Sequence, residues 1–150
     1  MSTATSMRPE NTEYPVYCEG YVSLVPQGDI VSTLGTQLKE TLSLIRGIPE
    51  ARGDFRYAEG KWNIKEVVQH IIDGERIFCN RALVIARQDK TTPLPSFDAD
   101  DYGTASNADR RTKEDLIEEL QAVQQSSKKL FESFDDVQLR NKGTVNDYTI

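Results

Sequence analysis

The apolar positions of the chain fall into three stretches that repeat every three or four residues, the period of an α-helix that buries one face. The first stretch predicts a helix over residues 30–47. Its apolar positions are Leu34, Leu38, Leu42 and Ile45. Asp29 stands where an N-cap residue is expected, and Gly47 and Pro49 end the stretch.

The other two stretches also begin with recognisable caps. Asn63 and Glu66 have the spacing of a capping box and open the second helix. Its apolar arc comprises Ile64, Val68, Ile71, Phe78, Ala82, Ile85 and Ala86. A third helix is predicted over residues 113–134, opened by Thr112 with Asp115 at the cap spacing. Its core-facing stripe comprises Leu116, Leu120, Val123, Ser127, Leu130, Phe131 and Phe134. Three amphipathic helices predict an all-α fold.

The segments between the helices divide the chain. Residues 14–26 are aromatic and apolar but broken by prolines, which predicts an extended arm over one end of the helices. Residues 89–111 predict a loop long enough to be functional or mobile. Its acidic run, residues 98–101, lacks the spacing of an EF-hand, so a solvated loop is favoured over a calcium site. We therefore expect an N-terminal arm, residues 1–27, and a helical bundle domain, residues 28–150.

Composition narrows the function classes. The 150 residues suffice for one domain, and the net charge of −6, with 24 acidic against 18 basic side chains, argues against nucleic acid as the partner. No stretch approaches the roughly 18 consecutive apolar residues of a membrane span, and the N-terminus lacks the apolar core of a signal peptide. Cys18 and Cys79 have no zinc or disulfide spacing. We expect a cytoplasmic protein with reduced thiols and no membrane partner.

The single histidine of the chain, His70, is the main chemical candidate. It lies at the edge of the apolar arc of the second helix, beside the core, with one flank open to solvent or substrate. Gly74, one turn later, indicates either a close approach of another group or simple drift. Glu66, one turn earlier, is a candidate weak or second-shell ligand. Asp73, one turn later, points toward the polar face. Cys79 lies nearly opposite His70 around the helix, which excludes it from a site with His70.

Two further side chains stand out on or near this helix. Glu75 falls inside the apolar arc, and because a buried unpaired carboxylate is costly, an ion-pair partner is expected. The candidate partners are Arg56, Lys61, Arg110 and Arg111. Trp62, at the entrance of the helix, is interpreted as a core anchor rather than a substrate platform.

Several sequence blocks occur in an order typical of one family. Residues 58–78 read AEGKWNIKEVVQHIIDGERIF, and residues 21–30 read YVSLVPQGDI. The further matching blocks are residues 81–83, 85–87, 93–98 and 100–102. Together they resemble the DinB-like superfamily of metal-binding four-helix bundles, over nearly the whole chain. The resemblance implies an up-down bundle, of which this sequence holds the first three helices and the N-terminal arm.

The resemblance also implies a metal site. Family members usually hold one divalent metal, commonly nickel or zinc, with three His side chains, and His70 matches the ligand of the second helix. The other two ligands belong to an HExxH-like or HExHH-like stretch of a fourth helix. This sequence reaches residue 150 about where that helix would begin, so we expect a truncated member. One imidazole cannot replace three protein ligands, so metal binding is expected to be weak or absent.

Two function classes follow. The resemblance implies a metal-dependent transferase, which activates a low-molecular-weight thiol for transfer to an electrophile, or a metal-dependent hydrolase, in which metal-bound water is the nucleophile. The sequence identifies no catalytic residue, His70 is expected only as a metal ligand, and the chain alone is expected to be inactive. The alternative is a non-enzymatic interaction protein, because three amphipathic helices without a fourth leave an apolar groove that favours a partner helix or a homodimer.

Overall fold

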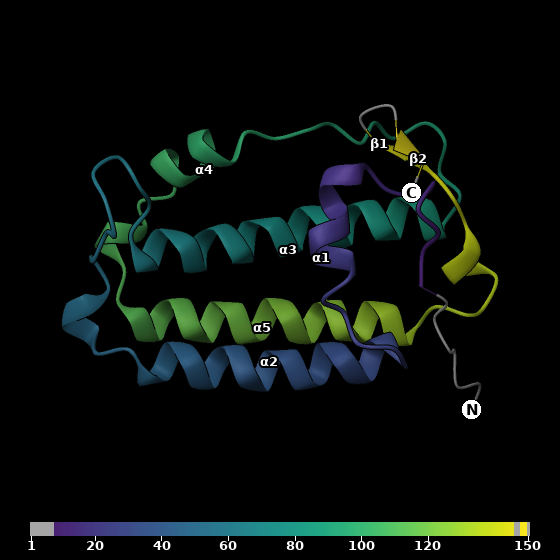
Figure 1. Cartoon of the computed structure of the whole chain (residues 1–150). Helices are drawn as coiled ribbons and strands as arrows, with labels where there is room; N and C mark the ends of the chain where they lie inside the picture. Colours follow the sequence, from purple (N-terminus) through teal and green to yellow (C-terminus); the bar gives the residue numbers. More distant parts are fainter. Residues whose placement is uncertain (1–7, 146–147, 150) are drawn as a thin grey trace.

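The structure of the chain, a computed structural model, describes residues 8–145 and 148–149 and is mostly helical (Figure 1). Three long helices, α2 (Ile30–Gly47), α3 (Ile64–Ala86) and α5 (Lys113–Glu132), lie side by side. α5 lies between the other two and packs against both. This confirms the predicted all-α class. The shorter helical elements are η1 (Val16–Cys18), α1 (Glu19–Val22), η2 (Glu50–Arg52), α4 (Ala99–Ala105), η3 (Ala108–Arg110) and η4 (Gln138–Arg140).

The long helices do not simply alternate in direction. The first turns of α3 and α5 meet, because Arg111, just before α5, donates to Gln69, and later turns meet where Cys79 donates to Ser127. α3 and α5 therefore run parallel, whereas α2 runs against them. The segment between α3 and α5 crosses back along the bundle, carrying α4 on the way (Figure 1). The predicted up-down order is wrong for this pair, because helix periodicity carries no information on the path of a long connection.

The caps predicted from sequence start all three long helices. The Asp29 side chain accepts from the Ser32 N–H at 2.7 Å, and the Thr112 hydroxyl accepts from Asp115 N–H at 3.1 Å. Asn63 accepts from the Glu66 N–H at 2.8 Å while the Glu66 carboxylate accepts from the Asn63 N–H at 2.7 Å, a complete capping box. These bonds satisfy N–H groups that have no partner inside the helix.

The core lies where α5 meets α2 and α3. Its buried members are Leu42, Ile45, Val68, Ile72, Leu116, Ile117 and Leu120. Burying one such side chain stabilises the fold by about 1.5–3 kcal/mol. Ile72 is fully buried although it was outside the predicted arc, and Phe78, inside that arc, is 58% exposed. The buried face of α3 is thus rotated relative to the predicted arc. Ile72 faces α5, whereas Phe78 faces away from it.

Lys113 joins the end of α2 to the start of α5. It is buried, and its ammonium donates to the carbonyls of Ile45 at 3.2 Å, Arg46 at 3.3 Å, and Ile48. These carbonyls end α2 and carry the negative end of its dipole, so a cation is favourable there. The Lys113 N–H donates to the Glu50 carboxylate at 3.0 Å.

Two predicted irregular segments are partly helical. The arm is not extended, because η1 and α1 occupy residues 16–22, and the Arg8 guanidinium caps the end of α1 by donating to the carbonyls of Val22 and Val25. The loop of residues 89–111 contains α4 and η3. The Asp98 side chain begins α4 by accepting hydrogen bonds from the N–H groups of Asp100 and Asp101. The acidic run is therefore a helix start, where carboxylates are favourable, rather than a loop.

The described chain ends in a short strand pair. β1 (Thr144–Val145) pairs antiparallel with β2 (Tyr148–Thr149). The resemblance placed the start of a fourth helix in this stretch, so within the described residues it is a strand pair instead.

The same substitution at two glycines should shift stability in opposite directions. At Gly74, inside α3, an added Cβ would meet only the Phe78 ring at 3.7 Å, so the close-approach interpretation of this glycine has no support among the described residues. We expect Gly74→Ala to raise the free energy of unfolding by up to about 1 kcal/mol. At Gly53 the Cβ would lie 2.7 Å from Lys65 Cε, and we expect Gly53→Ala to lower the free energy of unfolding by about 1 kcal/mol. Urea unfolding measures both, and a destabilised Gly74→Ala would contradict this geometry.

Candidate functional site

His70 lies on α3 against a single aromatic neighbour. The centroid of its ring is 4.7 Å from that of Trp62, and the two planes are tilted by 46°. Trp62 directly precedes the N-cap Asn63, so the capping box that starts α3 also fixes where the indole emerges. Both side chains are half-buried. His70 therefore sits beside the core, as predicted, but beneath an aromatic cover.

The two nitrogens of the imidazole differ in their surroundings. Nδ1 of His70 is buried, and no hydrogen-bond partner for it exists among the described residues. Nε2 is not enclosed in this way. Any partner from outside therefore has access to Nε2 before Nδ1.

Helix α4 also lies close to Trp62. α4 contacts α3, and a Cβ added at Gly103 of α4 would lie 3.2 Å from Nε1 and 3.4 Å from Cε2 of Trp62. A side chain at this position would require the indole or α4 to shift by a few tenths of an ångström. Trp62 therefore neighbours both α4 and His70.

The acidic and thiol groups near His70 in sequence are engaged elsewhere. Glu66 pairs with Arg56 at 2.6 Å, and Asp73 accepts from Gln69 at 2.9 Å. Cys79 faces α5 and donates to Ser127 at 2.9 Å. Burial raises the pKa of the Cys79 thiol, which leaves little of the reactive thiolate at neutral pH. Of these groups, none converges on the imidazole.

The donor set does not complete a metal centre. Among the described residues, no three His, Cys, Asp or Glu side chains lie close enough together to hold a metal ion. A metal on Nε2 would also leave the proton on Nδ1, which lacks the acceptor that ligating histidines usually have. The described residues thus do not fit a catalytic metal centre by themselves.

The ion pair predicted for Glu75 is wrong. Its carboxylate is half-buried and accepts from the Cys79 thiol at 3.9 Å, and no ion pair involves it within the described part of the chain. Arg56 pairs with Glu66 instead, and Arg111 with other acids. Glu75 lies one turn before Cys79, which contacts α5, and because its carboxylate is only half-buried it needs no buried cation.

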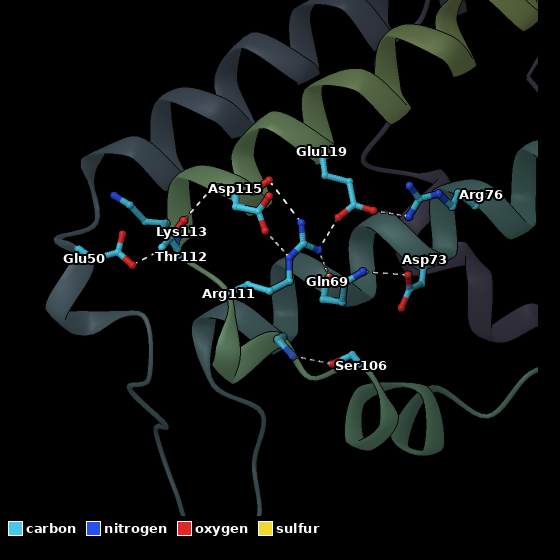
Figure 2. Close-up of polar contacts among 11 residues, drawn as sticks. Glu50, Gln69, Asp73, Arg76, Ser106, Arg111, Thr112, Lys113, Asp115 and Glu119 are labelled. Carbon is cyan, nitrogen blue, oxygen red and sulfur yellow. Dashed lines mark hydrogen bonds and ion pairs between the residues drawn. The ribbon is translucent and has the colours of Figure 1, made fainter.

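A polar network between α3 and α5 was not predicted (Figure 2). Arg111 donates to Asp115 at 2.6 Å, to Gln69 at 2.7 Å, and to Glu119. Glu119 also pairs with Arg76 of α3 at 2.6 Å. The spacing of Arg111 and Asp115, four residues apart, was the one sequence signal for it. Because every charge is paired, the network joins two helices and offers no free group for catalysis.

An apolar groove of about 670 Å³ separates α2 from α3. Its helical walls comprise Thr41, Leu44, Ile45, Ile48, Asn63, Ile64, Val67, Val68 and Ile71. Leu44 is 70% exposed and Val67 is 42% exposed, so the lining is open to solvent. Trp62 lines the groove, whereas His70 does not. The predicted role of Trp62 as a core anchor is therefore incomplete, because the indole also lies between the groove and the imidazole.

The comparisons with known proteins identify the family. The model of the DinB superfamily matches residues 33–149, so the chain belongs to the DinB superfamily, as the resemblance indicated. No curated protein and no solved structure matches the chain significantly. In the part of the chain that the structure describes, no helix is long and apolar enough to span a membrane.

The stability of the α3 start should depend on pH through Glu66. The Arg56 guanidinium, by donating to Glu66, lowers the pKa of that carboxyl below its ordinary value. The unfolded chain then binds this proton more readily than the folded chain. The stabilisation is therefore present above the unfolded pKa of about 4.3 and is lost as the pH falls through the lower folded pKa.

We expect Glu66→Gln to lower the free energy of unfolding at neutral pH by about 1 kcal/mol, because the charge-assisted bonds to Arg56 and Asn63 weaken. Below the ordinary carboxyl range the difference from wild type should shrink. Urea unfolding from about pH 7 to about pH 3 measures this. Glu59→Gln, at an exposed carboxylate, is the control. An unchanged gap at acid pH would show that the charge of Glu66 is not the cause.

Proposed function

We propose that this chain is a DinB-type domain that supplies His70 as one ligand of a divalent-metal site, nickel or zinc, serving thiol transfer or hydrolysis. Membership of the superfamily supports this, and the observation that carries it is the one imidazole of the chain, half-buried on α3 within the matched residues. When bound in a complete site, such a metal would activate a thiol or water as nucleophile. The remaining ligands would come from outside the described residues.

A metal titration tests this proposal. With Ni²⁺ or Zn²⁺, isothermal titration calorimetry of the chain should give only weak binding, because one imidazole is too few ligands for a divalent metal. That weak binding should disappear in His70→Ala and persist in Cys79→Ala, the matched loss of a potential ligand on the opposite side of α3. Binding that survives His70→Ala would refute the role of His70. A tight stoichiometric site in a monomer would refute the incompleteness of the site.

A second candidate function is self-association through the groove. Its apolar lining faces solvent on both helices, which is the kind of surface that marks an interface. A second copy of the chain suits it, because in a two-fold dimer the same groove is presented twice and each copy covers the other. In this reading the chain is a homodimeric interaction protein and not an enzyme.

Light scattering coupled to size-exclusion chromatography tests the dimer. We expect the apparent mass to rise with concentration in the wild type and to fall towards that of a monomer in Leu44→Glu, because a carboxylate would be buried in an apolar interface. Leu24→Glu is the control, since Leu24 is 80% exposed and lies outside the groove. A wild-type monomer at all concentrations, or equal effects of both variants, would exclude this candidate.

A further inference from the structure

Trp62 lies beside the imidazole of His70, and α4 lies close to Trp62. The imidazole has Trp62 at 4.7 Å on one side, and Trp62 in turn has the backbone of Gly103 against its indole nitrogen. Trp62 directly precedes the N-cap Asn63, so the capping box fixes the backbone from which the indole extends. A displacement of α4 would therefore reach His70 through the indole of Trp62.

We propose that Trp62 and α4 form a cover on His70 that withdraws Nδ1 and leaves Nε2 as the one nitrogen that an external group can reach. Trp62 is in this sense a positioning residue, and Gly103 is the point at which α4 rests on it. The cover fixes the tautomer of the neutral ring. A proton on Nδ1 would be buried with no acceptor among the described residues, whereas a proton on Nε2 can be donated to water.

The tautomer has a consequence for the metal site, and this step rests on the proposed function. A nitrogen that carries a proton cannot ligate a metal. In the tautomer proposed, Nε2 carries the proton, and Nδ1 is unprotonated and covered. Ligation through Nε2 therefore requires that its proton move to Nδ1, which has no acceptor among the described residues unless the cover shifts or an acceptor reaches it. The cover thus regulates whether the imidazole is available.

The chain offers a clean test, because His70 is its only histidine. A nitrogen–proton long-range correlation spectrum of the metal-free protein at about pH 9, where a free imidazole is neutral, distinguishes the two tautomers. We expect the wild type to carry its proton on Nε2. Trp62→Ala should show a mixture of tautomers and several-fold faster modification of the imidazole by diethyl pyrocarbonate. Trp62→Phe should restore the wild-type pattern because it keeps an aromatic ring.

Two further variants separate the cover from general loss of structure. Gly103→Ala adds a Cβ 3.2 Å from the Trp62 indole nitrogen and should shift the spectrum towards that of Trp62→Ala without altering either ring. Tyr57→Ala removes another aromatic side chain of the same groove and should leave the spectrum unchanged. Circular dichroism identifies folded variants, and Gly103→Ala serves if Trp62→Ala does not fold.

A wild-type proton on Nδ1, or wild-type spectra in both Trp62→Ala and Gly103→Ala, would overturn the cover. These measurements use no metal, so such a result leaves the assignment of His70 as a ligand untouched. Conversely, nickel binding that ignores His70 refutes that assignment and leaves the cover standing. If both hold, Trp62→Ala should bind Ni²⁺ more tightly than the wild type in calorimetry, whereas Tyr57→Ala should not.

Discussion

Helix α5 enters the bundle with two cations that face in different directions. Lys113 donates to the last carbonyls of α2, and Arg111, just before it, donates to Gln69 of α3 and to acids of α5 itself. Next along α5, Leu116 and Ile117 are fully buried between the two neighbours. The first turn of α5 therefore sets the position of both other long helices, by polar contacts at the end of the bundle and by apolar packing further in.

This dependence explains what the bundle leaves open. Because α2 and α3 each pack on α5, their remaining apolar residues face each other across a groove instead of meeting. Leu44 and Val67, which line this groove, are exposed for this reason. Parallel α3 and α5 also require a connection that returns along the bundle, and this connection brings α4 onto Trp62. The groove and the cover on His70 are thus two results of the same helix arrangement.

The sequence predicted what is decided locally. The caps at Asp29, Asn63 and Thr112 were read correctly because each depends on hydrogen bonds within one turn. The family could be recognised because its blocks keep their order. The burial of Ile72 and the solvation of Glu75 could not be read, since both depend on which neighbour α3 faces, and periodicity gives a direction around one helix only.

The candidate site divides in the same way. His70 could be singled out because it is the only histidine and lies on the matched helix. Its cover could not, because Trp62 is placed by a cap and Gly103 comes from a segment that reads as a loop, more than thirty residues away. The Arg111 network was missed for a similar reason: its partner Gln69 belongs to a helix that periodicity does not place beside it.

The groove and the imidazole are also neighbours on α3. His70 follows Val67 by three residues, which places it about 60° further around the helix. An element lying in the groove against Val67 would therefore reach the edge of the Trp62 cover. An unpaired N–H on Nδ1 costs about 1–3 kcal/mol, equivalent to roughly one or two powers of ten in the affinity of any group bound at Nε2. An occupant that brought an acceptor to Nδ1 would remove that cost, so filling the groove and binding a group at Nε2 would favour each other.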